Sequence, residues 1–386
     1  MNELYLRYKS IAVFSAVKES VKPLAELCVC TSLAERLELA AKVFARAAEC
    51  GAESTGEWME KLMLADDNAF SRLCARGERV PAGIKKQVRT ELLTFKQLSL
   101  VSPENIFDGE ESAFAPKFGH GGFGMTEEKL AAFYALNGCG ALAVGNTFVY
   151  RDGTFMPTAS DDVTLSDLKN YAEEKAEIVR NTENFIAGLP AFNALLYGDR
   201  GTGKSTTVRA IAHDYKSKLK VIEISRDGID RLPDIKAALA GLKQKFILFV
   251  DDLSFDEDAH DAERFKAALE GSLYSGQSNT LLYCTSNRRH LFKETDKDGM
   301  RHRSDEVQAE LALFDRFGLV ITYITPDRNG FTDILKQILR SRGIKWRDEY
   351  AAVAELAAIK KGGRSPRAAK QIADLIESTY AEKRGE

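Results

Sequence analysis

The stretch that decides the fold is residues 198–205, which read Gly-Asp-Arg-Gly-Thr-Gly-Lys-Ser. It fits the pattern G-x-x-x-x-G-K-[ST], follows the apolar run Ala194–Tyr197 and precedes the helical sequence TTVRAIAHDY. Glycines without a Cβ let such a loop wrap a phosphate with its N–H groups pointing inward, and the helix that follows adds its dipole. Because the strand–loop–helix context is the one that the pattern requires, we predict a phosphate-binding loop rather than a chance glycine-rich turn.

The residue types in this loop predict how it would hold a nucleotide. We expect Lys204 to supply a positive charge to the β- and γ-phosphates and the Ser205 hydroxyl to ligate Mg²⁺. The sequence has no Asn-Lys-x-Asp string that would read guanine. The residues expected to contact the nucleotide are Gly198, Asp199, Arg200, Gly201, Thr202, Gly203, Lys204, Ser205 and Thr206.

Two carboxylates follow a second apolar run. Phe246–Val250 is followed directly by Asp251 and Asp252, and the distance from Lys204 leaves room for one helix, one strand and another helix. We expect Asp251 to hold Mg²⁺, through water, and Asp252 to orient or deprotonate an attacking water. The structural alternative is that Asp251 caps the turn after the strand.

Three further polar residues come in a suggestive order along the chain. Asn287 ends the run Cys-Thr-Ser-Asn and could position water near the γ-phosphate. Arg316, in Asp-Arg-Phe-Gly, would face a neighbouring subunit's nucleotide, and Arg367 would point from the last helix back to the phosphates. Each also has an ordinary interpretation, as a strand-end turn residue, a surface ion pair and a solvated helix charge respectively.

The surrounding pattern predicts an α/β core. Short, continuous Val/Ile/Leu/Phe runs alternate with helical patterns, which is typical of strands buried on both faces of a parallel sheet. The predicted strands are Ala194–Tyr197, Val221–Ile224, Phe246–Val250, Leu281–Thr285 and Leu319–Ile324.

Outside this core we expect mainly helices. Residues 1–98 form a helical module in which Ser32 and Glu35 have capping-box spacing. Residues 99–163 are expected to be a connector of loop, helix and a small hairpin that turns at residues 151–153. The nucleotide-binding core would span 164–326 and a helical lid 327–386.

Five strings together carry a family resemblance. GDRGTGKST, FVDDL, CTSNRR, DRFG and GGRSPR resemble the AAA+ ATPases, and among them the bacterial family catalogued as domain of unknown function 815. The resemblance implies a five-stranded core with a helical lid, ATP bound between them, and a ring or partial ring of subunits. In family terms it matches Lys204 and Ser205 to Walker A, Asp251 and Asp252 to Walker B, Asn287 to sensor 1, Arg316 to the arginine finger and Arg367 to sensor 2.

One residue departs from the family pattern. The second Walker B acid is usually Glu, whereas Asp252 is shorter by one methylene group, and positioning dominates this chemistry. The expected function is therefore slow or stimulated hydrolysis of ATP to ADP and phosphate, which remodels or switches a macromolecular partner, with the chain acting as a homo-oligomer. The alternatives are a nucleic-acid-associated loader similar to helicase loaders, and an ATP-dependent adaptor that does not hydrolyse ATP.

Composition excludes some other classes. With 44% hydrophobic and 29% charged residues among 386, the chain is ordinary for a globular protein, and 54 basic against 57 acidic residues give no overall polyanion-binding signature. The sequence has no run of 18 apolar residues, so it predicts no membrane span. Charged residues interrupt the first twenty positions, which argues against a secretion signal. No two of the six cysteines form a CxxC pair. We expect a cytoplasmic protein with reduced thiols.

Weaker candidates remain. Arg288, Arg289 and His290, and the trio Arg301, His302 and Arg303, fit either a channel role or a solvated loop. His120 is expected to be a loop residue rather than a metal ligand. Leu168 and Tyr171 lie at positions where proteins of the AAA+ class often contact adenine.

Overall fold

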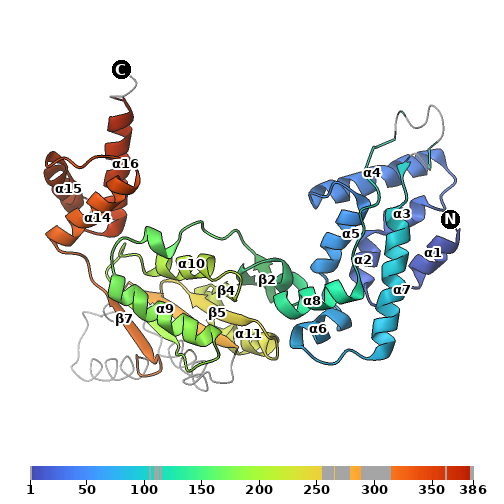
Figure 1. Ribbon diagram of the computed structural model, residues 1–386, viewed down its shortest axis with the longest axis horizontal. Coiled ribbons are helices and arrows are strands. Elements are labelled where there is room, and N and C mark those ends of the chain that lie inside the picture. Colours follow the sequence, from blue (N-terminus) through green and yellow to red (C-terminus); the bar gives the residue numbers. More distant parts are fainter. Residues whose placement is uncertain are drawn as a thin grey trace, which may run out of the picture. The chain divides into compact units, whose positions relative to one another are not determined.

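The computed structural model describes residues 2–103, 106–107, 113, 115–253, 265, 279–287, 314–360 and 363–382. The chain divides into two compact units (Figure 1), which we call the helical unit, residues 1–145 with 241–244, and the α/β unit, residues 146–240 with 245–386. No helix in the described part of the chain combines the length and the apolar character needed to cross a membrane.

The helical unit packs its helices around one apolar core. Trp58, Met59 and Phe95 are buried in it, and the edge of the Phe70 ring meets Tyr134 with ring centres 6.2 Å apart. Its helices are α1 (Asn2–Lys9), α2 (Ser15–Ser20), α3 (Lys22–Leu27), α4 (Leu33–Glu49), α5 (Thr55–Leu64), α6 (Ala69–Arg76), α7 (Ala82–Ser99) and α8 (Glu127–Asn137), followed by the 3₁₀ turn η3 (Gly140–Val144).

One helix start differs from the prediction. Helix α4 begins at Leu33 as the sequence indicates, but the Ser32 side chain makes no capping hydrogen bond, and the Glu35 carboxylate instead accepts from the thiol of Cys30 at 3.1 Å. The predicted capping box is therefore wrong. Helix α5 is capped, because the Ser54 hydroxyl accepts from the backbone N–H of Glu57 at 3.2 Å.

The α/β unit contains a seven-stranded sheet in the order β2-β1-β4-β5-β6-β3-β7. All five predicted strands are present and parallel to their neighbours, which confirms the predicted fold class, and the hairpin β1–β2 extends the sheet by pairing β1 with β4. The strands are β1 (Thr147–Arg151), β2 (Thr154–Pro157), β3 (Ala194–Gly198), β4 (Leu219–Ile224), β5 (Lys245–Val250), β6 (Thr280–Ser286) and β7 (Leu319–Tyr323).

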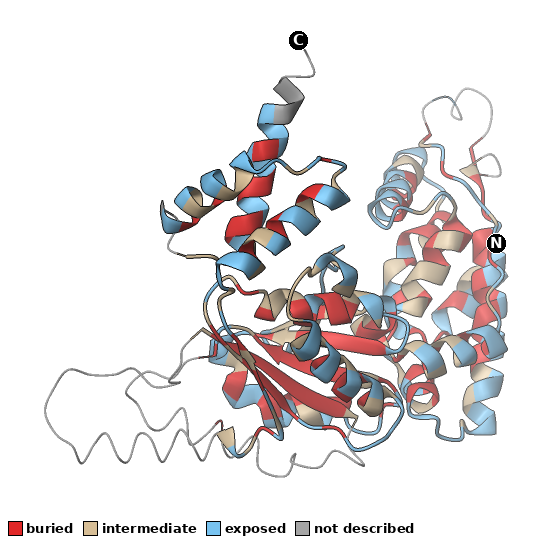
Figure 2. Ribbon diagram, turned by 60° about the vertical axis from the view of Figure 1, so that its left-hand side comes forward, coloured by how far each residue is buried: buried red, intermediate tan, exposed pale blue. Residues whose placement is uncertain are grey.

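The helices of this unit surround the sheet (Figure 1). Figure 2 shows the strands of the sheet's centre as an almost continuous buried layer, which explains why β3 to β6 read as unbroken apolar runs rather than alternating ones. The flanking elements are η4 (Leu165–Asp167), α9 (Ala172–Ile186), α10 (Lys204–Asp214), η5 (Arg226–Arg231) and α11 (Leu232–Leu239).

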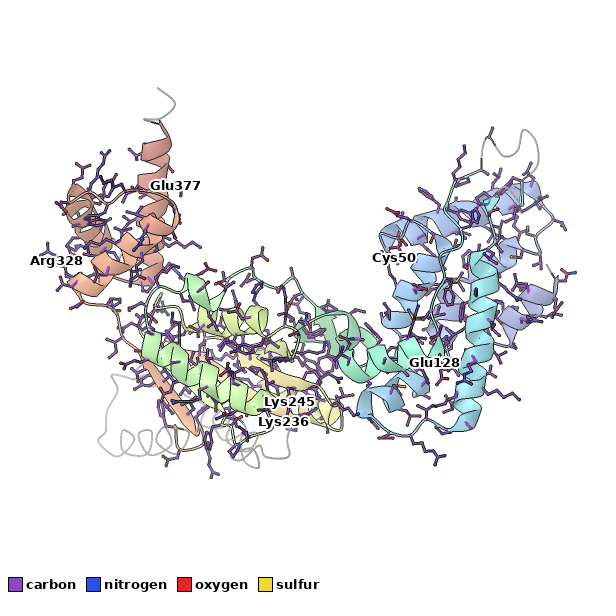
Figure 3. The ribbon with its side chains drawn as sticks, viewed as in Figure 1. Cys50, Glu128, Lys236, Lys245, Arg328 and Glu377 are labelled. Atoms are coloured by element: carbon purple, nitrogen blue, oxygen red, sulfur yellow. The ribbon has the colours of Figure 1, made fainter. Side chains whose placement is uncertain are left out.

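The segment predicted to be a lid contains three helices among its described residues: α14 (Arg328–Ser341), α15 (Glu349–Lys360) and α16 (Pro366–Glu382). Their own apolar core includes Phe331, Leu335 and Ile372. The guanidinium of Arg342 donates to the carboxylates of Asp374 and Glu377 at 2.7 and 2.8 Å, which ties α14 to α16 (Glu377 is labelled in Figure 3).

The predicted connector, residues 99–163, is divided between the two units. Residues up to 145 belong to the helical unit, whereas the hairpin from residue 147 is part of the sheet. A short hairpin at the edge of a sheet needs a neighbouring strand to be stable, and β4 supplies one.

Candidate functional site

The glycine-rich loop joins the carboxyl end of β3 to the start of α10. Gly198 has φ +130°, and a Cβ there would lie 2.0 Å from the carbonyl oxygen of Tyr323 on β7, so no other residue fits. Gly201 has φ +76°, and its Cβ would lie 2.9 Å from the Ser365 hydroxyl of the lid. The loop therefore depends on glycine both for its own conformation and for its contacts with β7 and the lid.

Lys204 is buried at the first position of α10. Its ammonium donates to the carbonyl oxygens of Gly198 and Asp199 at 3.0 and 2.7 Å. Burial lowers the pKa of Lys204 to about 8 from its usual 10.5. The ammonium thus lies inside the loop, where it would neutralise charge on a bound phosphate.

The carboxylate of Asp251 faces the start of α10. Its Oδ1 accepts hydrogen bonds from the Ser205 hydroxyl at 2.6 Å and from the Thr285 hydroxyl at 2.5 Å. The hydroxyl of Ser205 and the carboxylate of Asp251 are donor types that Mg²⁺ prefers. Among the described residues no group of three or more His, Cys, Asp and Glu could hold a metal ion.

Asp252 and Asn287 lie together beside this carboxylate. The Asn287 amide donates to Asp252 Oδ1 at 2.7 Å, and the backbone N–H of Asp252 donates to the Thr285 hydroxyl at 3.0 Å. Asp252 has φ +54°, a left-handed conformation that is uncommon for a residue other than glycine. Three neighbouring strands, β3, β5 and β6, thus bring the loop, the acidic pair and the amide to one edge of the sheet.

Comparison with known proteins identifies the family. Residues 146–380 match the model of the family described as "Protein of unknown function (DUF815)", which is more than half of the chain. The chain belongs to the DUF815 family. Its strand order and loop are those of an AAA+ P-loop fold, as the sequence predicts.

More distant relatives match parts of this DUF815 protein. It is 35% identical over 108 residues to the replication factor C large subunit of Sulfurisphaera tokodaii, covering 25% of this chain and 24% of that protein. It is 30% identical over 192 residues to the Holliday junction branch migration complex subunit RuvB of Prochlorococcus marinus, covering 47% and 49%. The chain thus spans between about a quarter and about half of these relatives' lengths. The solved RuvB motor of Thermotoga maritima is 17% identical with a TM-score of 0.40, over 57% of this chain and 66% of that one.

The remaining loop residues of the DUF815 protein divide into two groups. The Asp199 carboxylate accepts from the backbone N–H of Thr325 at 2.8 Å, and the Thr202 hydroxyl donates to the carbonyl of Asp199 at 2.8 Å, so both brace the loop. Arg200 is exposed, and Thr206 is half-buried on α10.

The two predicted arginines lie in different settings. The backbone N–H of Arg367 donates to the carbonyl of Gly201 at 3.2 Å, while its side chain is exposed. Arg316 is half-buried in the segment before β7, where the ring of Phe314 lies 5.6 Å from that of Tyr197. Their roles towards a nucleotide remain predictions.

Among the weaker candidates, Tyr171 packs against β7 and the residue that follows it. It has φ +61°, its hydroxyl donates to the carbonyl of Ile324 at 2.7 Å, and its ring lies 4.9 Å from that of Tyr323. Leu168 is half-buried and its carbonyl accepts from Lys175. His120 is an exposed residue outside helices and strands. The clusters 288–290 and 301–303 lie outside the described residues.

Sequence reasoning missed three residues around Asp251. Thr285 donates to Asp251, Arg209 on α10 lies 3.7 Å from its Oδ2, and Asp161 lies 3.5 Å from Arg209. Thr285 stands in the string that contains Asn287, but no motif marks Arg209 or Asp161, because their proximity arises only when the hairpin joins the sheet.

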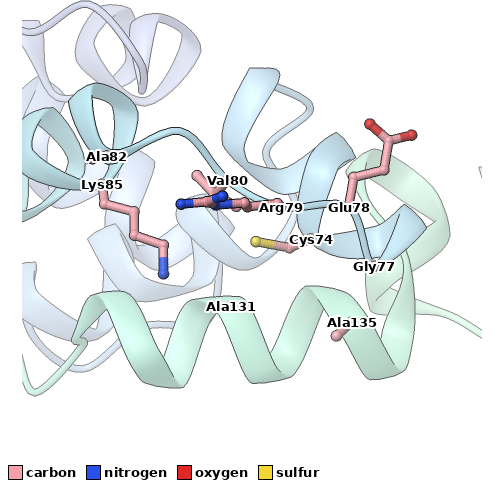
Figure 4. A pocket seen from close by; sticks show the side chains of 9 residues that line it. All are labelled: Cys74, Gly77, Glu78, Arg79, Val80, Ala82, Lys85, Ala131 and Ala135. Atoms are coloured by element: carbon pink, nitrogen blue, oxygen red, sulfur yellow. The ribbon is translucent and has the colours of Figure 1, made fainter.

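A separate cavity of about 440 Å³ lies in the helical unit (Figure 4). Figure 4 shows Cys74 and Lys85 on its wall, opposite Ala131 and Ala135 of α8. Burial raises the pKa of the Cys74 thiol, so it stays protonated at neutral pH. None of the motif residues lines this cavity.

Proposed function

We propose that this DUF815 protein binds ATP with Mg²⁺ and hydrolyses it slowly to ADP and phosphate, in order to switch or remodel a macromolecular partner. The observation that carries the proposal is the 2.6 Å hydrogen bond between the hydroxyl of Ser205 and the carboxylate of Asp251. This bond joins the glycine-rich loop to the acidic end of β5, and such an arrangement supports Mg²⁺-dependent phosphoryl transfer.

In this proposal the chain's own groups hold the phosphates. The loop N–H groups and the start of α10 bind phosphate oxygens, and the Lys204 ammonium turns from its carbonyl partners towards the β- and γ-phosphates. Ser205 and Asp251 would hold Mg²⁺, which would supply positive charge to the phosphoryl group.

Asp252 and Asn287 would handle the attacking water. Their mutual hydrogen bond uses Oδ1 of Asp252. The remaining lone pairs of the carboxylate can accept from water while Asn287 orients the side chain. The short reach of Asp252 supports slow or partner-stimulated turnover.

Arg316 would act on a neighbouring subunit's nucleotide and Arg367 on the subunit's own. Because Arg316 would act on the nucleotide of a neighbouring subunit, the proposal includes a homo-oligomer.

The experiment is ATP turnover measured across a range of protein concentrations. We expect turnover per subunit to rise with concentration, to disappear in Asp252→Asn, and in Arg316→Ala to fall and to lose its concentration dependence. Exposed Arg180 on α9 provides the matched control Arg180→Ala, which should behave as wild type. Turnover that is unaffected by Asp252→Asn would overturn the hydrolytic role.

Two specific observations favour other functions. The short side chain of Asp252, at a position where the family pattern has Glu, also suits an adaptor that binds ATP without turnover, even when its partner is present. The names of the partial relatives, replication factor C and a Holliday junction subunit, favour a nucleic-acid loader. The loader predicts single-stranded DNA binding that weakens steeply with salt, and an absence of binding at low salt would exclude it.

A further inference from the structure

Arg209 is a cation placed at the acidic strand end. It lies on α10 four residues after Ser205, so both side chains are on the same face of the helix. Its Nη2 is 3.7 Å from Oδ2 of Asp251, and its Nη1 is 3.5 Å from Oδ2 of Asp161. The guanidinium is therefore shared between two carboxylates.

The two oxygens of Asp251 have different neighbours. Oδ1 accepts from the hydroxyls of Ser205 and Thr285, whereas Oδ2 faces Arg209. A positive charge this close to a metal-facing carboxylate opposes the approach of a divalent cation, and the opposition grows as the guanidinium approaches the oxygen.

Asp161 lies outside the five predicted core strands, on the segment that follows the added β1–β2 hairpin. It belongs to the segment that follows β2, and a cavity of about 210 Å³ lies between this segment and α10. Asp161, Arg209 and Glu223 of β4 all line this cavity. The hairpin thus brings a carboxylate to the arginine that neighbours Asp251.

We propose that Arg209 is a positioning residue that weakens Mg²⁺ binding at Asp251, and that Asp161 limits this effect by attracting the guanidinium away. The inference rests on the proposed function, since it concerns the same Mg²⁺–nucleotide site. It makes the β1–β2 hairpin a regulator of metal affinity: displacement of Asp161 strengthens the Arg209–Asp251 pair and weakens Mg²⁺ binding.

The test is a Mg²⁺ titration of the protein with a fluorescent ATP analogue. The measured quantity is the Mg²⁺ concentration at which half of the Mg²⁺-dependent change in analogue binding has occurred. Because the ion pairs are partly exposed, each effect is modest. Arg209→Gln should lower this concentration about two- to fivefold, and Asp161→Asn should raise it about two- to fivefold. The double variant should match Arg209→Gln, because Asp161 acts only through Arg209.

Arg180→Gln, at an exposed position of α9, is the matched control and should leave the Mg²⁺ dependence of analogue binding unchanged. Thermal unfolding of all variants separates loss of fold from loss of metal binding. Equal Mg²⁺ dependence in the folded variants, or additive effects in the double variant, would overturn the inference while ATP binding itself stands. Failure of the wild type to bind the analogue, with Mg²⁺ or with EDTA, would overturn the proposed function together with the inference.

Discussion

One carboxylate in the helical unit and one in the α/β unit bind partners of different kinds. In the helical unit, Glu91 on α7 is 2% exposed and accepts the backbone N–H groups of Ala12, Val13 and Phe14 at 2.8 to 3.0 Å. In the α/β unit, the half-buried carboxylate of Asp251 instead binds the side chains of Ser205 and Thr285. Contacts to fixed backbone stabilise a fold, whereas pairs between side chains can be exchanged for a ligand.

The largest expected effect comes from removing the Glu91 carboxylate. Glu91→Ala leaves three backbone N–H groups without their acceptor, so we expect the free energy of unfolding of the helical unit to fall by about 3–5 kcal/mol. Trp58, buried in this unit, reports the transition by fluorescence in urea when the lid tryptophan is replaced in a Trp346→Phe background.

Glu91→Gln is the matched control. The amide keeps one acceptor oxygen for Ala12 and Val13, so it should lose less than half as much stability as the alanine variant. Equal losses below 1 kcal/mol in both variants would contradict a structural role for the carboxylate.

A smaller effect of opposite sign is expected at Lys220 in β4. The side chain is buried and its Nζ lies 5.8 Å from the centre of the Phe148 ring, and burial lowers its pKa to about 8 from 10.5. Folding therefore disfavours the protonated form, and this destabilisation is complete below pH 8 and is lost as pH rises towards 10.5. Lys220→Met should add about 2 kcal/mol at pH 7.

Hydrogen exchange of the β4 amides measures that gain. The difference between Lys220→Met and wild type should shrink between pH 8 and 10.5. A variant that is less stable than wild type at pH 7 would show that the lysine's contacts outweigh its desolvation.

The smallest expected effects concern helix starts in the helical unit. Ser54→Ala removes the cap of α5 and should lower stability by about 1 kcal/mol. Ser32→Ala should change it by less than about 0.3 kcal/mol, because the Ser32 side chain makes no capping bond. Urea unfolding followed by Trp58 fluorescence compares them, and equal losses would show that Ser32 caps α4 in solution.

The sequence predicted the strands and the glycine-rich loop of the α/β unit better than it predicted helix caps. Strand ends and the loop are encoded locally, by apolar runs and by the spacing of Gly198, Lys204 and Ser205, and the parallel sheet then brings Asp251 beside Ser205. The predicted capping box failed because Ser32 and Glu35 have the required spacing, but Glu35 finds a partner in Cys30.

Contacts between distant segments could not be predicted. The Asp161–Arg209 pair joins residues 48 positions apart, and Glu91 accepts from backbone groups 77 to 79 positions earlier. No periodicity or motif encodes such pairings, since they depend on how the hairpin enters the sheet and how α7 packs against the first helices.

The most direct test of the central claim, that the α/β unit holds a Mg²⁺–ATP site, is calorimetric titration of ATP with Mg²⁺ into the full chain and into Lys204→Ala. We predict one ATP per subunit for wild type and an affinity at least 100-fold lower in the variant, equivalent to about 2.7 kcal/mol. Lys86→Ala, at an exposed position of α7, should bind as wild type does. Absence of ATP binding by the folded wild type, or equal binding by Lys204→Ala, would contradict the account.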